Sequence, residues 1–338
     1  MSGRGSGVEV IAELAQGFEG RLEQARLLLK AAAAAGADAA KYQLVYADEL
    51  AAADYKHYAL FRSLEMPDEA WAELARDAAA LGIQLQVDIF GRRSLDLAVR
   101  IGAAAIKLHP TDLANVGLLH AVAASAIPRV LLGAGGCLAA ELAEALTILA
   151  AKPVVILLGF QGYPTPEAAN QIARVRHVLE GPARSRPGIV VGFADHAAPE
   201  SPLRFALAAM AIGAGATVIE KHLTLGRIMK LEDHESALNP DEFREFTETI
   251  RGCAVALGTV TPDADFGMAD EEKVYRTAIR RHVVAARPLR KGTTLGPADL
   301  ALKRTSAGSP MTDPGAAYSR VLARDLDPDA PLLAADLE

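Results

Sequence analysis

The sequence predicts a (β/α)8 TIM barrel followed by a small β-rich domain. Three observations lead to this fold class: short apolar segments alternate with longer helix-like segments, the alternation occurs eight times, and the pattern changes abruptly after Gly258. Uninterrupted apolar strands that alternate with helices are typical of a parallel sheet covered by helices. Eight such units in about 250 residues match a barrel of this kind.

The expected strands are spaced so that each leaves room for one helix. They are residues 8–14, 39–45, 83–90, 104–109, 129–135, 154–160, 189–196 and 218–224. Alanine-rich stretches such as residues 31–40 are interpreted as helix and helix end, because alanine is the best helix former. A doubly wound open sheet is the alternative fold. It usually carries a glycine-rich turn after its first strand, whereas residues 13–20 contain two spaced glycines and no such turn motif.

Chemically active side chains gather where the expected strands end. They are Glu13, Lys41, Gln43, Asp88, Lys107, His109, Gln161, Tyr163, Asp195, His196, Glu220, Lys221 and His222. The active sites of such barrels lie at the C-terminal ends of the strands, so we expect these residues to line one pocket at the mouth. Lys221 is the exception, because strand alternation points it away from Glu220 and His222. We expect it to be structural.

The chain beyond the barrel divides into a linker and a compact tail. Residues 259–279 are polar and are predicted to form a linker with a short helix, while residues 1–258 form the barrel domain. Residues 280–338 contain short strand signals and two similar phrases, PLRKGTTLGPADL and DLDPDAPLLAADL. Each phrase has a turn, a leucine and a short helical stretch that ends in Asp-Leu. We expect a separate small domain here.

Composition excludes several classes of function. The net charge of −7 argues against a general nucleic-acid binder. No apolar run approaches the roughly 20 residues needed to span a bilayer, so no membrane association is expected. The first residues show no signal peptide pattern, and two cysteines are too few for a disulfide scaffold. A cytoplasmic protein is expected.

Several motifs in order resemble those of the N-acetylneuraminate (sialic acid) synthase family, with its C-terminal antifreeze-like (SAF) domain. The motifs are KYQ (41–43), GYPTPEAANQI (162–172), GFADH (192–196), VIEKHLTLGR (218–227) and EDHESALNPDEF (232–243). The resemblance covers nearly the whole chain. It implies an enzyme that condenses phosphoenolpyruvate with the aldehyde of an N-acetylated hexosamine or a related sugar. The products are a 2-keto-3-deoxy sugar acid and phosphate.

The resemblance also implies roles for individual residues. His196 and His222 would bind a divalent metal, Mn²⁺ or Mg²⁺, and Glu13 would handle a proton or bind a sugar hydroxyl. Substrate contacts would come from Lys41, Gln43, Lys107, Gln161, Tyr163, Asp233 and Arg304. Relatives imply a domain-swapped homodimer in which Arg304 serves the site of the other subunit.

The positions of the two histidines support the metal assignment independently of the family resemblance. Two imidazoles from adjacent strand ends can converge on one ion and leave positions open for water and a substrate aldehyde. Each histidine follows or lies close to an acidic residue, Asp195 or Glu220, and we expect these carboxylates to orient the imidazoles.

The chain departs from the family where hydroxyl residues are expected around the phosphate. Asp88, Pro110 and Ala194 stand at such positions. An ionised Asp88 would repel a phosphate, so we expect it to pair with Arg92 or Arg93, or to hold a hydroxyl of the acceptor. Two alternatives follow from these departures. One is a divergent metal-dependent aldolase or lyase that acts on a 2-keto acid, and the other is a non-catalytic sugar-binding relative.

Overall fold

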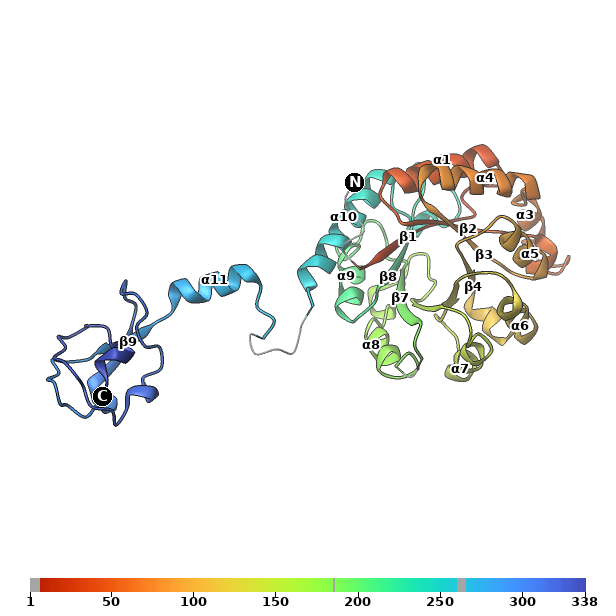
Figure 1. Cartoon of the computed structure of the whole chain (residues 1–338). Helices are drawn as coiled ribbons and strands as arrows, with labels where there is room; N and C mark the ends of the chain where they lie inside the picture. The colour runs from red at the N-terminus through yellow and green to blue at the C-terminus, as the bar shows by residue number, and fades with distance from the viewer. Residues whose placement is uncertain (1–6, 185, 260–265) are drawn as a thin grey trace. The chain divides into compact units, whose positions relative to one another are not determined.

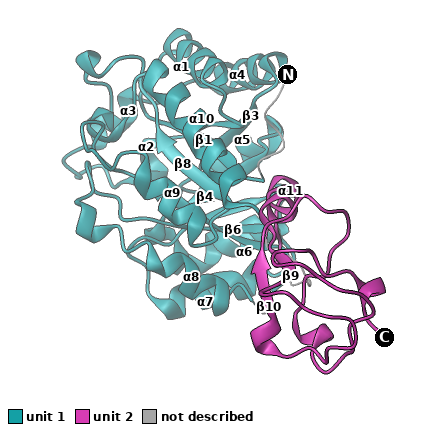
Figure 2. Ribbon diagram, turned by 90° about the vertical axis from the view of Figure 1, so that its left-hand side faces the viewer, with its two compact units in different colours: residues 1–258 teal, residues 259–338 magenta. Residues whose placement is uncertain are grey.

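The computed structural model describes residues 7–184, 186–259 and 266–338 of the chain. It consists of two compact units, Met1–Gly258 and Thr259–Glu338, which Figure 2 colours separately. None of the described helices combines the length and the apolar composition needed to cross a bilayer.

The large unit is a closed barrel of eight parallel strands, in which each strand pairs with the next and β8 pairs with β1. The strands are β1 (Glu9–Ala15), β2 (Ala39–Gln43), β3 (Gln84–Asp88), β4 (Ala105–Leu108), β5 (Val130–Gly133), β6 (Val154–Leu158), β7 (Ile189–Asp195) and β8 (Val218–His222). The predicted (β/α)8 fold is confirmed. All strands except β1 end one or two residues before the predicted end, so the polar residues beyond them lie in the loops of the mouth.

Helices follow the strands and surround the barrel (Figure 1). In the large unit they are α1 (Leu22–Ala34), α2 (Ala47–Leu50), α3 (Tyr58–Ser63), α4 (Asp68–Leu81), α5 (Arg92–Arg100), α6 (Val116–Ala124), α7 (Ala139–Ile148), α8 (Ala173–Glu180), α9 (Ala206–Gly213) and α10 (Pro240–Leu257). The buried face of α1 carries Ala25, Leu28 and Ala32, and its small side chains let the helix lie close to the strands.

Strand alternation sorts the side chains into an inner and an outer set. Tyr42 points outward, where its hydroxyl donates to Ala25 O at 2.8 Å and its ring makes an edge contact with Trp71. Its neighbours Lys41 and Gln43 therefore face the inside of the barrel.

The barrel interior is built in layers. Near the strand starts, Glu9 accepts hydrogen bonds from Gln86 at 3.1 Å and from Arg129 at 2.5 Å. An apolar layer follows, with Ile11, Ala39, Ala105, Leu131, Val155 and Val218. Two residues farther along four of these strands come Glu13, Lys41, Lys107 and Glu220. The apolar layer thus supports a layer of charged groups at the mouth.

The small unit has its own apolar core and a two-stranded antiparallel sheet of β9 (His282–Ala285) and β10 (Leu300–Lys303). The two repeated phrases of the sequence make the same contacts: Asp299 Oδ2 accepts from Gly296 N, and Asp336 Oδ2 accepts from Leu333 N, each at 2.9 Å. The small β-rich tail is thereby confirmed. Within the predicted linker lies α11 (Asp270–Ile279), while residues 260–265 fall outside the described residues.

Candidate active site

Five charged side chains form a buried ionic network at the C-terminal end of the barrel. Lys41 Nζ contacts Glu13 Oε2, lies 2.5 Å from Asp88 Oδ1 and 3.6 Å from Glu220 Oε2. Lys107 Nζ lies 2.6 Å from Glu220 Oε1. Register explains the meeting, because Glu13 pairs with Lys41 in the sheet and Asp88 pairs with Lys107.

The network is almost fully excluded from solvent. Burial lowers the pKa of Lys41, against the raising effect of Asp88 and Glu220. Burial opposes ionisation of Asp88, but Lys41 and Lys107 outweigh it and lower the pKa of this carboxyl group. Burial also opposes ionisation of Glu220, and the same lysines lower its pKa. For Lys107, the carboxylates of Glu220 and Asp88 outweigh burial and raise the pKa of the ammonium group. Mutual pairing therefore holds these charges in the interior.

The two predicted metal-binding histidines meet beside this network. The ring centroids of His196 and His222 lie 5.1 Å apart at an angle of 52°. Tyr163 covers both, with its ring centroid 5.3 Å from His196 and 5.6 Å from His222. Burial lowers the pKa of His196 to about 3, and burial together with His196 lowers the pKa of His222 well below its usual value. Both imidazoles are neutral at pH 7.

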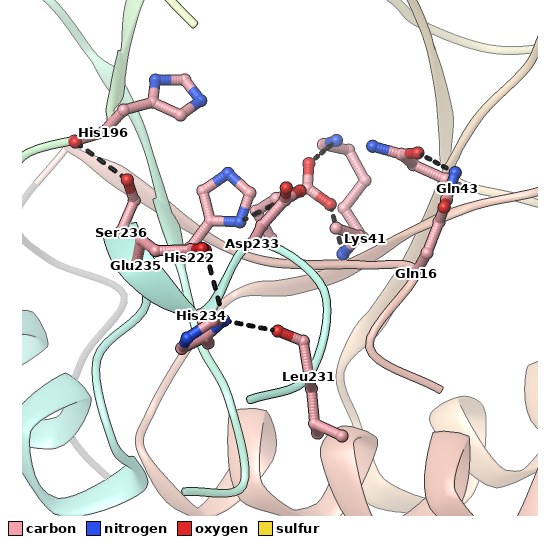
Figure 3. Close-up of polar contacts among 12 residues, drawn as sticks. Gln16, Lys41, Gln43, His196, His222, Leu231, Asp233, His234, Glu235 and Ser236 are labelled. Carbon is pink, nitrogen blue, oxygen red and sulfur yellow. Dashed lines mark hydrogen bonds and ion pairs between the residues drawn. The ribbon is translucent and has the colours of Figure 1, made fainter. Parts of the chain in front are cut away.

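This donor set fits a divalent cation held by two protein ligands. Neutral imidazole is the form that binds metals, and His196 Nδ1 lies 3.2 Å from Ala194 O, which leaves Nε2 for another partner. Asp233 Oδ2 is 4.0 Å from His222 Nδ1 (Figure 3). Within the described residues, no group of three or more His, Cys, Asp or Glu side chains is arranged around a metal position.

The loop after β8 brings Asp233 to the histidines. Ser236 Oγ donates to His196 O at 3.1 Å, and His234 Nδ1 lies 3.0 Å from Leu231 O (Figure 3). Burial raises the pKa of Asp233 to about 7, with Glu232 and Glu235 adding to the effect. His234 thus belongs to the loop scaffold, whereas Asp233 faces the site.

The remaining predicted substrate-binding residues occupy three different places. Gln43 accepts a hydrogen bond from Gln16 Nε2 at 2.7 Å at the rim of the ionic network (Figure 3). Gln161 is half-buried in the loop after β6, on the same segment as Tyr163. Arg304 is exposed in the small unit, directly after β10. The structure therefore brings all predicted site residues except Gln161 and Arg304 into described contacts near the mouth.

Two expectations about acidic residues are wrong. Asp195 does not orient His196; its Oδ1 lies 3.2 Å from Lys221 Nζ and accepts from Ala197 N at 2.8 Å. Glu220 contacts the lysines instead of an imidazole. For Asp195 the cause is strand alternation, which places adjacent residues of one strand on opposite faces of the sheet. Glu220 and His222 are two residues apart and share one side, and there the two lysines take up both oxygens of Glu220. Lys221 is structural, as expected.

The expected pairing of Asp88 with Arg92 or Arg93 is also wrong. Arg92 pairs with Asp96, and the guanidinium of Arg93 lies over the Tyr46 ring. Both arginines belong to α5 or its start, outside the barrel, whereas Asp88 faces inward to Lys41. Asp88 Oδ2 lies 2.9 Å from His109 Nε2.

Sequence reasoning gave no role to two residues of the site. His109 was expected at the mouth, but its pairing with Asp88 was not. Alternation offered a signal, because His109 follows Lys107 by two residues and shares its side of the sheet. Gln16, the partner of Gln43, lies beyond the end of β1, and no periodicity marks such a position.

Comparison with known proteins agrees with this geometry. Residues 28–262 match the NeuB family, and residues 280–338 match the SAF domain. The chain is 29% identical over 309 residues to an uncharacterized protein of Methanocaldococcus jannaschii, covering 90% of this chain and 87% of that protein. It is 27% identical over 322 residues to an N,N'-diacetyllegionaminic acid synthase of Legionella pneumophila, covering 88% and 86%.

A solved structure shows the same likeness in three dimensions. The N-acetylneuraminic acid (sialic acid) synthetase of Leptospira borgpetersenii, in complex with citrate, is similar with a TM-score of 0.70 and 25% identity, covering 80% of this chain and 92% of that chain. These matches confirm the resemblance found in the sequence motifs. Because the family match spans more than half of the residues, the chain belongs to the NeuB family and carries a C-terminal SAF domain.

Proposed function

We propose that the protein condenses phosphoenolpyruvate with an N-acetylated hexosamine or a related sugar aldehyde, giving a 2-keto-3-deoxy sugar acid and phosphate. The observation that carries this proposal is the placement of two neutral imidazoles, His196 and His222, beside the buried lysines of the barrel mouth. Two relatives that are named as enzymes, the legionaminic and sialic acid synthases, support the same class of reaction.

His196 and His222 are the residues that would hold the divalent metal, Mn²⁺ or Mg²⁺. When bound, such an ion supplies Lewis-acid polarisation of the aldehyde carbonyl. Tyr163 makes edge-type ring contacts with both imidazoles, which are themselves buried. Asp233, whose carboxyl group has a pKa near 7, is placed to contact a hydroxyl of the acceptor. Gln43 and Gln161 are proposed as further polar contacts of the substrates.

Lys41 and Lys107 supply the positive charge that a phosphate and a carboxylate require. The C2=C3 π electrons of phosphoenolpyruvate form the new bond to the aldehyde carbon, whose C=O π bond breaks as its oxygen takes up a proton and becomes a hydroxyl. Water adds to C2, and the C2–O bond to phosphate then breaks as the oxygen of that water becomes the keto oxygen. Glu13 is the proposed acceptor of the proton that this water loses. Its Oε1 accepts from Ala15 N at 2.7 Å and its Oε2 contacts Lys41, so the carboxylate is held at a fixed position.

The proposal also covers the domains of the chain and the assembly of two copies of it. We propose that residues 1–258, 259–279 and 280–338 act as barrel, linker and SAF domain, and that the protein is a domain-swapped homodimer. In this arrangement the exposed Arg304 completes the acceptor site of the other subunit. Arginine suits this role, because its planar group binds oxygen acceptors in a fixed geometry.

A phosphate-release screen tests the function. Phosphoenolpyruvate is supplied with manganese and with a panel of N-acetylated hexosamines and plain aldoses. We expect release to depend on one of the N-acetylated sugars. If phosphoenolpyruvate yields no phosphate with any sugar while a 2-keto sugar acid is cleaved, the protein is an aldolase. If metal binds but neither reaction occurs, the non-catalytic alternative holds.

A further inference from the structure

Among the residues that the structure describes, both lysines of the barrel mouth, Lys41 and Lys107, are already paired with carboxylates. Lys41 is in contact with Glu13 and Asp88, and it lies 3.6 Å from Glu220; Lys107 contacts Glu220 at 2.6 Å. Three carboxylates thus face two ammonium groups in a space almost closed to solvent. A phosphate or carboxylate that approaches Lys41 must compete with a carboxylate already there.

Of the two carboxylates that accept a hydrogen bond from Lys41, those of Glu13 and Asp88, Asp88 is the one for which the structure describes a second side-chain partner to hold it when a donor displaces it. It uses one oxygen for Lys41, with Oδ1 at 2.5 Å, and the other for His109, with Oδ2 at 2.9 Å from Nε2. His109 lies at the edge of the network, where its side chain is 21% exposed while that of Asp88 is 1% exposed. Its ring rests against Phe90, with centroids 5.2 Å apart. Asp88 would therefore keep a hydrogen-bond partner after losing Lys41.

We propose that Asp88 is an internal anion that occupies Lys41 until the donor arrives, and that His109 is the positioning residue that retains Asp88 once the donor has displaced it. This inference rests on the proposed function, because it takes phosphoenolpyruvate as the anionic donor. In this inference the Asp88–His109 pair controls how tightly the donor binds. A bound donor would replace one anion by another at Lys41, while Asp88 stays in the site on His109.

His109 affects donor binding because it remains a partner of the Asp88 carboxylate after the donor has displaced it from Lys41. A buried carboxylate that loses its ammonium partner is costly unless another group satisfies it. His109 Nε2 can donate to Asp88 Oδ2 in both states, whereas an apolar side chain at position 109 leaves Asp88 with Lys41 as its remaining described partner. Donor binding would then leave a buried charge unpaired.

Phosphoenolpyruvate binding measured by calorimetry, at one fixed manganese concentration, tests the pair. Asp88→Asn keeps the shape of the side chain but removes its charge, and we expect it to bind at least about tenfold tighter than the parent. His109→Leu is expected to bind about tenfold weaker. His109→Gln, which can still donate an N–H, should recover part of this loss. In the Asp88→Asn background, His109→Leu should change affinity by less than about twofold.

Each outcome decides one point. If His109→Leu weakens donor binding equally in both backgrounds, His109 contacts the donor directly. If Asp88→Asn binds the donor as tightly as the parent does, Asp88 does not compete with it. Either result overturns the inference and leaves the proposed function standing. If the parent and all variants bind no phosphoenolpyruvate, the proposed function fails and the inference with it. Asp88→Thr serves as a second charge-removing variant where Asp88→Asn does not fold, and thermal unfolding of each variant checks its fold.

Discussion

Lys107 Nζ lies 2.6 Å from Glu220 Oε1 and joins β4 to β8 across the barrel interior. The two residues are 113 positions apart in the chain, and both side chains are almost fully excluded from solvent. A pair of this kind is expensive to break from one side, because the remaining charge stays buried and loses its nearest partner.

The first prediction concerns this pair. Lys107→Met and Glu220→Gln are each expected to lower the free energy of unfolding by about 3–5 kcal/mol. The double variant should be less destabilised than the sum of the two single variants, since it removes both charges. Denaturant unfolding of the four proteins measures this. Additive losses would mean that the 2.6 Å contact contributes no coupling.

The second prediction concerns metal binding. His196→Ala and His222→Ala should each lower the affinity for Mn²⁺ at least about 100-fold, because each removes one of two protein ligands. The matched control is His234→Ala, whose imidazole meets Leu231 O in the loop; its affinity should stay close to that of the parent. Calorimetric titration with Mn²⁺ measures the affinity of the parent and of these three single variants. A double alanine variant at positions 196 and 222 that binds the ion as tightly as the parent contradicts the assignment.

The third prediction concerns the pH dependence of the small unit. Asp299 accepts from Gly296 N and pairs with Arg287 at 2.6 Å. The hydrogen bond from Gly296 N lowers the pKa of Asp299 below its usual 3.8, against a smaller opposing effect of burial. The native state therefore favours the carboxylate, so its stabilisation is present above about pH 4 and is lost as pH falls further.

Asp299→Asn should accordingly lower the local stability of residues 280–338 by about 1 kcal/mol at pH 7. The difference between parent and variant should shrink as pH falls below the usual pKa of an aspartate. Amide hydrogen exchange of the full chain, followed by mass spectrometry at several pH values, reports on this segment. A difference that grows toward acid pH would reverse the sign and refute the account.

The fourth prediction concerns assembly. When Arg304→Ala and Lys41→Ala subunits are mixed, a swapped dimer contains one barrel with both residues intact. After random exchange, half of the dimers are mixed and each has one complete site, so activity should return to about a quarter of the parent value. Each variant alone is expected to be weakly active. Absence of recovery, with exchange verified by native mass spectrometry, counts against the swap.

Much of the fold was predictable because barrel strands carry a strong local signal. Uninterrupted runs such as Val154–Leu158 (β6) are buried on both faces and are apolar throughout, which fixes their type and order. The ends of the strands were less predictable. The polar residues of the mouth are equally compatible with the end of a strand and with the start of a loop, so composition does not separate the two. The repeated contacts of Asp299 and Asp336 correspond to a repeat that was already visible in the sequence.

The gathering of the candidate residues at the barrel mouth was predictable, and their pairings were less so. Family-like motifs located His196, His222, Lys41 and Lys107, and strand ends placed them together. Partners were harder to predict, because they depend on register across strands that are distant in sequence. Asp88 illustrates this: nearby arginines in the chain were plausible partners, yet the pleat turns Asp88 inward, where Lys41 and His109 meet it.

The most direct test of the central claim is mass spectrometry of the product formed from carbon-13-labelled phosphoenolpyruvate and an N-acetylated hexosamine, with manganese present. The account predicts a sugar acid that has gained all of the labelled carbons of the donor, formed in equal amount with released phosphate. A Lys41→Met variant should form much less of both products. Release of phosphate without a labelled sugar acid, or conversion of a 2-keto sugar acid to pyruvate with no use of phosphoenolpyruvate, would contradict the account.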